Sequence, residues 1–464
     1  METHRLYALL FTVTALGSCT LTPDYFRPTV PIPPTFTAKS PVPVPSIDPE
    51  WWRLFRSRTL NRLVAEANAD NTDIAAAVSR VEQARASFRI ARASLFPAIE
   101  ASGDATITRT KVEGMSAQTR KSLAAAGNLN YDFDIFGGNR AATASARAEL
   151  ASSYFDREFV ELTIQSEVAL TYISLLLDRE RVRISDGTIV NFNEVLHIAE
   201  ARFEAGAATT LDISQQKSAL ASARAIRAEL VELVRNSENA LAVLLGDAAG
   251  TLKVNGTGLN DLRAPKVSPG QPAALLYRRA DIRRAEADLI AANADIGVAR
   301  SALFPSLSLD LDAAVATDPL TTTIAIGSSL LAPIFQGGRL RAGVKLSEAR
   351  KAELVEAYRK TVLVALQEVE DALAAVKAAQ QRVADLSIAL NEARSAYRLS
   401  RVQYEAGAID FQTLLDAQRT LFVAEEALAI ARFDRLAAAV QLVRALGGGW
   451  VEQQAALRSD YSAG

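Results

Sequence analysis

The sequence predicts a mainly α-helical fold with a small β part, made of two copies of one structural unit. The first observation behind this prediction is a set of short motifs that recurs in the same order about 200 residues later. The second is a long run without Gly or Pro in which apolar residues fall at intervals of seven, which is typical of a coiled-coil helix. The third is the alternation of apolar and polar residues in short segments, which indicates strands. We therefore expect long antiparallel helical hairpins and four strands per chain.

Residues 1–18 have the pattern of a secretory signal peptide. The apolar run 6–16 is too short to span a bilayer, and it is followed by Gly17-Ser18-Cys19. This ending resembles a lipobox, in which the thiol of Cys19 takes a diacylglyceryl group and the new N-terminus takes an acyl chain. Two or more acyl chains anchor a protein stably, at about 0.8 kcal/mol per buried methylene. Thr20, where an aspartate is associated with inner-membrane retention, favours the outer membrane. The alternative is an incidental cysteine in an ordinary cleaved signal.

Residues 19–50 are predicted to form an extended strap between the lipid and the folded body. Nine of the sixteen prolines fall between Thr20 and Pro49. Proline fixes φ and has no N–H to donate, so such a stretch adopts a polyproline-like conformation rather than a domain.

The internal repeat is the strongest signal in the chain, and it predicts a first unit over 51–250, a second over 251–450 and a tail over 451–464. Three landmarks carry it, each present once in each half: a Phe-Pro pair, a Gly-Gly pair and a Glu-Ala-Gly-Ala segment. Their key residues are Pro97 and Pro305, then Gly137-Gly138 and Gly337-Gly338, then Gly206 and Gly407. Three landmarks in one order indicate duplication of a whole half-protein.

Each half begins with a helical stretch, about 72–95 and 278–303, that stops before Phe-Pro because the residue ahead of a proline is pushed out of the α region. Period-two alternation follows, as in Leu307, Leu309 and Leu311 against Ser308, Asp310 and Asp312. The predicted strands are about 98–111 and 122–136 in the first half, and about 305–316 and 321–335 in the second.

Long helices are predicted after each Gly-Gly pair, over about 139–205 and 339–405. In the second of these the heptad positions are Val355, Val362, Val369, Val376, Val383, Leu390, Tyr397 and Tyr404. At 1.5 Å per residue such a helix is roughly 100 Å long. In the first half, Gly187 interrupts the run. Each long helix is expected to turn at Gly206 or Gly407, where glycine takes positive φ without cost, and to return over about 211–245 or 412–446.

The composition argues against an enzyme and against nucleic-acid binding. The chain has two histidines and one cysteine, and His197 is the only imidazole outside the N-terminal segment, so no triad or zinc site can be assembled. We interpret His197 as an ordinary polar position on a helix. There is no glycine-rich phosphate loop. The formal net charge of −2 offers no clustered cationic surface. No catalytic residue, metal ligand or cofactor is predicted, apart from the lipid on Cys19.

The predicted strands match the length and pattern of outer-membrane barrel strands. A strand in lipid must leave no unpaired edge, and the smallest barrels of this kind need eight strands. One chain with four strands cannot close such a barrel, so several chains must combine around a polar lumen lined by Asp and Asn. A soluble sheet packed on helices is the alternative that alternation alone does not exclude.

Taken together, these features resemble the TolC-like outer membrane efflux protein family (outer membrane factors), in its NodT/OprM-type lipoprotein branch, over nearly the whole chain from Cys19 to Trp450. The residues that carry the resemblance are the lipobox, Pro23-Asp24-Tyr25 with Pro28, Trp51-Trp52, Arg278-Arg279-Ala280-Asp281-Ile282 leading to Ala285-Glu286, Ala291-Ala292-Asn293-Ala294-Asp295-Ile296-Gly297, both Phe-Pro and both Gly-Gly pairs, and Leu414-Leu415-Asp416-Ala417-Gln418-Arg419. The family commonly has proline where Ala280 stands, which affects only a helix start.

The resemblance implies a homotrimer in the outer membrane of a Gram-negative bacterium, with a twelve-stranded barrel and a periplasmic α-helical tunnel. It implies passive export of small molecules, such as drugs or toxic compounds, that an inner-membrane pump of the resistance-nodulation-division type delivers through a periplasmic adaptor, or membrane fusion protein. The hairpin turns at Gly206 and Gly407 would contact the adaptor. The alternatives are a type I protein secretion duct of the same fold and, less favoured because of the two repeats, a periplasmic adaptor lipoprotein.

The same resemblance implies a periplasmic gate formed by Asp416, Gln412 and Tyr404. Three symmetry copies of Asp416 would make a ring of carboxylates, whose mutual repulsion requires compensating contacts in the closed state. Gln412 stands where the family usually has an apolar residue that narrows the pore. A solvated charge beside a helix start is the alternative reading of Asp416.

Overall fold

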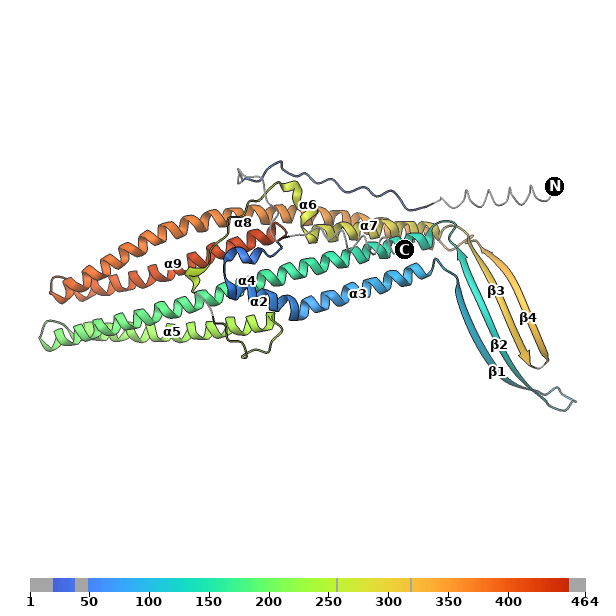
Figure 1. Ribbon diagram of the computed structural model, residues 1–464, viewed down its shortest axis with the longest axis horizontal. Coiled ribbons are helices and arrows are strands. Elements are labelled where there is room, and N and C mark those ends of the chain that lie inside the picture. The colour runs from blue at the N-terminus through green and yellow to red at the C-terminus, as the bar shows by residue number, and fades with distance from the viewer. Residues whose placement is uncertain (1–19, 38–48, 256–257, 318, 450–464) are drawn as a thin grey trace. The chain divides into compact units, whose positions relative to one another are not determined.

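The computed structural model describes residues 20–37, 49–255, 258–317 and 319–449. The signal peptide, the lipidation site Cys19 and the tail 451–464 lie outside the described residues, as does most of the second half of the strap. Within them the chain is mainly helical with a small β part, as predicted (Figure 1). It divides into two compact units, one from within residues 1–30, 79–155 and 283–361, the other from within 31–78, 156–282 and 362–464. Each sequence repeat therefore contributes to both units.

The same succession of elements occurs in each repeat. The first repeat contains η1 (Trp51–Phe55), α2 (Arg58–Asp70), α3 (Thr72–Ala93), β1 (Ala98–Thr110), β2 (Gln118–Phe133), α4 (Gly138–Glu204) and α5 (Thr210–Leu244). The second contains η2 (Leu259–Asp261), η3 (Pro272–Ala274), α6 (Leu275–Arg278), α7 (Ala280–Ser301), β3 (Ser306–Thr317), β4 (Leu320–Leu331), α8 (Arg339–Glu405) and α9 (Phe411–Ala445). Equivalent helices have equal lengths of 22, 67 and 35 residues. The duplication is thus preserved in the fold.

Several element bounds differ from the expected ones for local reasons. β2 begins four residues before 122, at Gln118, and ends at Phe133, because a turn follows in which the Ile135 N–H donates to the Phe133 carbonyl at 2.8 Å. β4 ends at Leu331, shortly before Pro333, which has no N–H to add to a ladder. The helix α4 continues through Gly187, since one glycine costs only about 1 kcal/mol in a helix interior. Ala280 is the first residue of α7.

The four strands form one antiparallel sheet in the order β1-β2-β3-β4 (Figure 1). One face is apolar, and residues that share it in register include Ile99, Leu129, Leu311, Ile324, Ile326 and Leu330. The opposite face is polar and includes Glu100, Asn128, Asn130, Asp310 and Asp312. Across the β2–β3 join, the amide of Asn128 donates to Asp312 at 2.6 Å and that of Asn130 donates to Asp310 at 2.7 Å. β1 and β4 are the edges, and both are exposed along their whole length.

The first part of the strap, residues 20–30, is held against α7 within the first unit. The amide of Asn293 donates to the Pro23 carbonyl at 2.7 Å, and the guanidinium of Arg27 donates two hydrogen bonds to Glu286, at 2.6 and 2.7 Å. A Cβ at Gly297 would overlap the Thr22 hydroxyl and would lie 3.0 and 3.1 Å from the Cβ atoms of Thr22 and Ala141, so a larger residue would have to displace its neighbours. These contacts explain why the chain carries Asn and Gly in that helix.

The second unit contains the main hydrophobic core. The rings of Trp51, Trp52 and Phe55 in η1 meet edge to face, with centroids 5.9 and 6.2 Å from that of Trp51. They pack with buried residues of α2 and α4, among them Leu60, Leu63, Val168, Tyr172 and Ile173. An 18-residue stretch of α4 has a mean hydropathy of 1.3, and half of it is buried within the fold, as in the core helix of a globular unit. In α8 the predicted heptad residues from Val355 to Tyr404 are all buried or half-buried.

Candidate functional site

The two long hairpins of the second unit end in the same turn geometry. After α4, the Gly206 N–H donates to the Phe203 carbonyl at 2.9 Å and the Ala207 N–H donates to the Arg202 carbonyl at 2.8 Å. After α8, the N–H groups of Gly407 and Ala408 make the equivalent bonds at 3.0 and 2.8 Å. Both glycines have positive φ, +76° and +75°, as this helix-ending motif requires. Figure 1 shows α5 and α9 returning antiparallel to the helices that precede them.

Side-chain caps begin both returning helices. At α5, the Thr209 hydroxyl accepts from the Asp212 N–H at 3.3 Å, and the Asp212 carboxylate accepts from the Thr209 N–H at 2.8 Å. At α9, the Asp410 carboxylate accepts from the Thr413 N–H at 2.8 Å. The hydrogen bonds from Thr413 lower the pKa of Asp410 below its ordinary value. Each turn is therefore fixed on both sides, by a left-handed glycine and by an N-cap.

Arg202 joins the end of the first hairpin to the end of the second. Its guanidinium carbon lies 4.5 Å from the centre of the Tyr404 ring, and its Nη1 donates to the Tyr404 carbonyl. Nη2 donates to the Ala207 carbonyl in its own turn at 3.3 Å. Tyr404 is only 2% exposed and meets the Phe411 ring edge to face at 5.8 Å. Burial raises the pKa of Tyr404 above its ordinary value. One cation thus holds an aromatic ring and the carbonyl ends of two helices.

An ion pair and an apolar cluster make further contacts between the same hairpins. Nη1 of Arg401 on α8 lies 3.1 Å from Glu194 on α4, and both side chains are well exposed. Beneath them Val195 of α4 packs with buried residues of α8 and α9, namely Leu390, Ala393, Tyr397, Tyr404, Phe411, Leu414, Leu415, Leu421 and Leu428. The contact between these hairpins thus combines an apolar cluster with an exposed ion pair.

The structure brings two of the three predicted gate residues together. Gln412 and Asp416 lie one turn apart on the exposed face of α9, where the Gln412 amide donates to the Asp416 carboxylate at 3.0 Å. Tyr404 is not on that face, because its ring is buried against Phe411 and under Arg202. Within one chain, therefore, Gln412 and Asp416 form a polar surface, whereas Tyr404 is part of the contact between hairpins.

The remaining landmarks lie where the strands meet the helices of the first unit. There Phe136 stacks on Phe304, which precedes Pro305, with ring centres 4.7 Å apart and planes at 21°. A hollow of about 820 Å³ is lined by both rings and by Phe335. Gly138 begins α4, and a Cβ there would lie 2.5 Å from the Ser301 hydroxyl. The neighbouring landmark glycines, Gly137, Gly337 and Gly338, have positive φ, and Pro97 precedes the first residue of β1.

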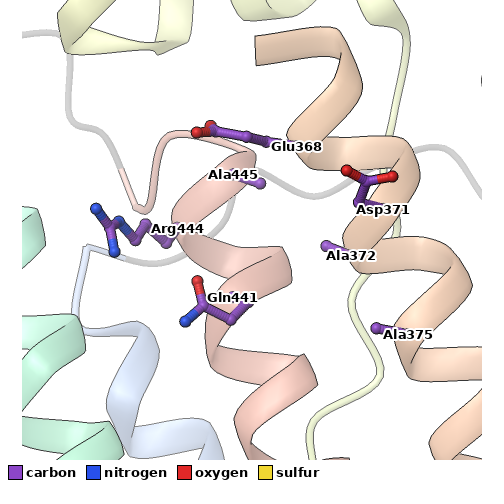
Figure 2. A pocket seen from close by; sticks show the side chains of 7 residues that line it. All are labelled: Glu368, Asp371, Ala372, Ala375, Gln441, Arg444 and Ala445. Carbon is purple, nitrogen blue, oxygen red and sulfur yellow. The ribbon is translucent and has the colours of Figure 1, made fainter. Parts of the chain in front are cut away.

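A second hollow, of about 350 Å³, lies between α8 and α9 in the second unit (Figure 2). Its lining residues are Glu368, Asp371, Ala372, Ala375, Gln441, Arg444 and Ala445. Figure 2 shows the two carboxylates on α8 and the Arg444 guanidinium turned away from them. None of the seven residues is Ser, Thr, Cys, Lys or His, and among the described residues no group of three or more His, Cys, Asp or Glu could hold a metal ion.

Beside this hollow, Arg279 forms a buried ionic cluster. Its guanidinium donates to both carboxylate oxygens of Asp281, at 3.0 and 2.7 Å, to Glu368 at 2.6 Å, and to the Ala445 carbonyl at the end of α9 at 3.0 Å. The Arg279 side chain is 7% exposed, that of Asp281 16% and that of Glu368 49%. This cluster joins the start of α7 to α8 and to the last turn of α9.

Arg202 and Arg401 were not among the functional residues predicted from the sequence. For Arg202 a signal exists, since the repeats match around it and it stands where the second repeat has Gln403. When two repeats match except at one residue, that residue can make a contact that the other repeat does not make, so Arg202 is a candidate for such a contact.

Comparison with known proteins identifies the family. The family model for outer membrane efflux proteins matches the chain twice, over residues 63–247 and 272–448. The pyoverdine export outer membrane protein OpmQ of Pseudomonas aeruginosa is 38% identical over 89% of this chain and 90% of its own length. The toluene efflux pump outer membrane protein TtgC of Pseudomonas putida is 32% identical over 97% of each. The solved structure of the outer-membrane channel OprN superposes with a TM-score of 0.86 at 28% identity, covering 93% of this chain and all of that one.

These matches confirm three predictions made from the sequence: the mainly helical fold with a small sheet, the location in the outer membrane, and the role of an efflux channel protein. The two segments that the family model matches also correspond to the two repeats. The chain belongs to the outer membrane efflux protein family.

Proposed function

We propose that this channel protein acts as a homotrimer, anchored by lipid on Cys19, and that it is the passive exit duct for small organic molecules delivered by an inner-membrane pump. The observation that supports the assembly best is the sheet. Its apolar face is exposed, with Ile99, Ile324 and Ile326 each about three-quarters accessible, and its edge strands β1 and β4 have no partner within the described chain. Exposed apolar side chains and free edges are what a barrel that closes in lipid requires.

The polar face of the sheet supports a wet lumen. Asn128 and Asn130 on β2 donate hydrogen bonds to Asp312 and Asp310 on β3, and the two carboxylates keep their charge, which requires water rather than lipid on this face. Three copies of a four-stranded sheet supply twelve strands, above the minimum of eight. A soluble sheet would cover its apolar face with helices, whereas this face is exposed.

We further propose that the pump is of the resistance-nodulation-division type and that the hairpin turns at Gly206 and Gly407 meet a periplasmic adaptor. The names of two relatives support small-molecule cargo, since OpmQ is described as exporting pyoverdine and TtgC as part of a toluene efflux pump. The two turns share one geometry and project beyond capped helices, so they offer an adaptor two similar surfaces per chain. The chain has no proposed enzymatic activity and no proposed cofactor besides the lipid.

The partners can be identified by photo-crosslinking in cells. A photoreactive residue placed at Ala207 or Ala408, beside the two turn glycines, is expected to capture an adaptor, with a resistance-nodulation-division pump in the same complex. The matched control places it at Ala101 on the sheet, from which no adaptor should be captured. Recovery of an ABC exporter would instead support a protein secretion duct. Capture of an adaptor from Ala101 alone would contradict the proposal that the hairpin turns, and not the sheet, meet the adaptor.

For the gate we propose that Asp416 and Gln412 narrow the pore at the hairpin ends, with three copies of Asp416 close to the axis. The observation that supports this role is their position together on the exposed face of α9, joined by a hydrogen bond of 3.0 Å. The alternative is that Asp416 is only a solvated charge near the start of α9, a role that requires neither a particular face of the helix nor a bond to Gln412.

Replacing Asp416 by alanine is expected to raise the conductance of the trimer in planar bilayers several-fold, because it removes both a bulky hydrated group and its bond to Gln412. Asp434, also on α9 but paired with Arg382 at 2.7 Å, provides a matched carboxylate deletion. Asp434→Ala should leave the conductance unchanged. Equal conductance of the Asp416→Ala channel and the unmodified channel would remove the gate role from Asp416.

A further inference from the structure

The internal repeat determines how neighbouring copies join. Within one chain, the two repeats are joined by β2 and β3, with Ala124 opposite Ala316 and Phe133 opposite Leu307. Continuing this register by three residues past the strand ends places Phe136 opposite Phe304. These are the two rings that stack with centres 4.7 Å apart. The aromatic pair is thus the continuation of the join between repeats, beyond its last ladder residue.

Both rings have counterparts in the other repeat that have no ring partner within the described chain. Phe304 precedes Pro305, and its counterpart is Phe96 before Pro97; Phe136 follows Ile135, and its counterpart is Phe335 after Ile334. Phe96 is 60% exposed and Phe335 is 88% exposed. They lie beyond the ends of β1 and β4, the two edge strands. A single chain therefore has β1 with Phe96 at one edge of the sheet and β4 with Phe335 at the other, and among the described residues neither has the partner that its counterpart has at the β2–β3 join.

We propose that β4 of one copy pairs with β1 of the next so that Phe335 stacks on Phe96 of the neighbouring copy. This inference rests on the proposed trimer and specifies its interface. In this register Leu331 lies opposite Glu100, Leu330 opposite Ala101 and Ser329 opposite Ser102. It repeats between copies the geometry that Phe136 and Phe304 have within one chain.

The faces of the sheet support this register independently of the rings. Ile324 would lie opposite Ile107, and Ile326 opposite Ala105, all on the apolar face that the in-chain pairing defines. A shift by one residue would turn the apolar face of one copy toward the lumen side of the next. Only shifts by two or more residues are then left as competitors, and those separate Phe335 from Phe96.

The helix start beside the rings shows a compensating exchange. In the chain, Gly138 at the start of α4 lies against Ser301, the last residue of α7. Counted along the two equally long helices, which end at Glu204 and Glu405, the residue of α8 that corresponds to Gly138 is Arg339, one residue after the second landmark glycine. The corresponding last residue of α3 is Ala93. Compared with the pair Gly138 and Ser301, the pair Arg339 and Ala93 has a large side chain at the helix start and no hydroxyl at the position that would face it. This exchange is consistent with contact between Arg339 of one copy and Ala93 of the next.

The register also gives an acceptable barrel. Following the pairing from Ala98 through Asn130, Asp310 and Gly327 to the next copy leads to Asp104, a step of six residues along β1. Three such steps around twelve strands correspond to a strand tilt of about 46°, close to the usual range of about 35–45°. A step of eight residues would give about 54° and a step of four about 35° on the same spacings. The strand tilt thus disfavours a step of eight residues. Stacking of Phe335 on Phe96 then favours a step of six residues over a step of four.

Disulfide formation tests the register directly. Residues directly opposite in antiparallel strands have Cα atoms about 4.5–5.5 Å apart, within disulfide range, whereas residues offset by two are about 7–8 Å apart. In the full-length protein, Ser102→Cys with Ser329→Cys should give covalent trimers on oxidation. The matched variants pair Ser102→Cys with Gly327→Cys or with Leu331→Cys, which report the registers shifted by two residues, and neither should crosslink efficiently. Ser102→Cys alone, with Cys19 retained in all variants, controls for other disulfides.

The outcomes separate the register from the assembly. Crosslinking in a shifted variant, or in none while native mass measurement still gives a trimer, overturns the register but leaves the trimer. A monomeric mass for the solubilised protein removes the proposed assembly itself. The rings are tested by a double-mutant cycle, in which Phe335→Ala and Phe96→Ala each lower the dissociation temperature of the trimer. The double variant should lose no more than the larger single loss, and strictly additive losses would show that the two rings do not touch.

Discussion

Substitution of Arg279 by alanine is expected to destabilise the folded chain by about 3–5 kcal/mol, the cost of removing one partner from a buried charge pair. The guanidinium is nearly inaccessible and donates four hydrogen bonds, two of them to Asp281, whose side chain is only 16% exposed. Without it, the largely buried Asp281 carboxylate keeps only the Ile282 N–H as a donor, at 2.9 Å, and the Ala445 carbonyl loses the guanidinium. Glu368 contributes less, because half of its side chain is already in water.

The measurement is the thermal unfolding of the detergent-solubilised protein, followed by circular dichroism of the helices. Arg279→Lys keeps the charge but cannot form the two-pronged contact with Asp281, so it should restore only part of the loss. Arg382→Ala is the matched control. It breaks a pair between α8 and α9 of the same length, 2.7 Å to Asp434, at an exposed site, and should cost about 0–1 kcal/mol. A loss at Arg279 no larger than that at Arg382 would show that the cluster is not important for stability.

The repeat and the periodicities were sufficient to predict the succession of helices and strands. Heptad spacing along α8 works as a signal because burial against other helices recurs every two turns, and the residues from Val355 to Tyr404 are all at least half-buried. The bounds of β2 and β4 were less accurate, because alternation continues through Ile135 in the first half and an apolar run continues to Phe335 in the second, although each hydrogen-bonded ladder ends earlier. Alternation reports which face a side chain occupies and does not report where strand pairing stops.

The contacts of the candidate site were harder to predict. Arg202 and Tyr404 are about 200 residues apart in the chain, and the difference between Arg202 and Gln403 in the two turns does not indicate which residue Arg202 contacts. Tyr404 is predicted at the gate together with Asp416, and its ring is buried in the interior of the hairpins, as its heptad position indicates. Arg279 belonged to a recognisable motif, whereas its partners Glu368 and Ala445 come from two other helices. Periodicity identifies the faces of helices, and tertiary packing decides which faces meet.

Replacing Arg202 by alanine is expected to favour the open channel strongly. The guanidinium is in contact with the Tyr404 ring and bonded to the Tyr404 carbonyl, so the ends of the first and second hairpins are held together by one side chain. A cation over an aromatic ring contributes about 0.5–2 kcal/mol, and a hydrogen bond to a charged group about 1.5–3 kcal/mol. If the hairpin ends separate on opening, losing about 2–5 kcal/mol changes the ratio of open to closed channels roughly 30- to 4,000-fold, at 1.4 kcal/mol per factor of ten.

Single-channel recording in planar bilayers measures this ratio, and two controls distinguish the Arg202 contact from general damage to the turn. Tyr404→Phe keeps the ring and the backbone carbonyl and removes a hydroxyl that has no hydrogen-bond partner among the described residues, so it should behave like the unmodified channel. Arg401→Ala breaks the exposed pair with Glu194 at 3.1 Å and should shift the ratio no more than about fivefold. Because the carbonyl acceptor survives any substitution of Tyr404, Tyr404→Leu should produce only part of the Arg202→Ala effect. Closed channels in the Arg202→Ala variant would mean that the apolar cluster around Val195 and Leu414 holds the hairpin ends together without the cation.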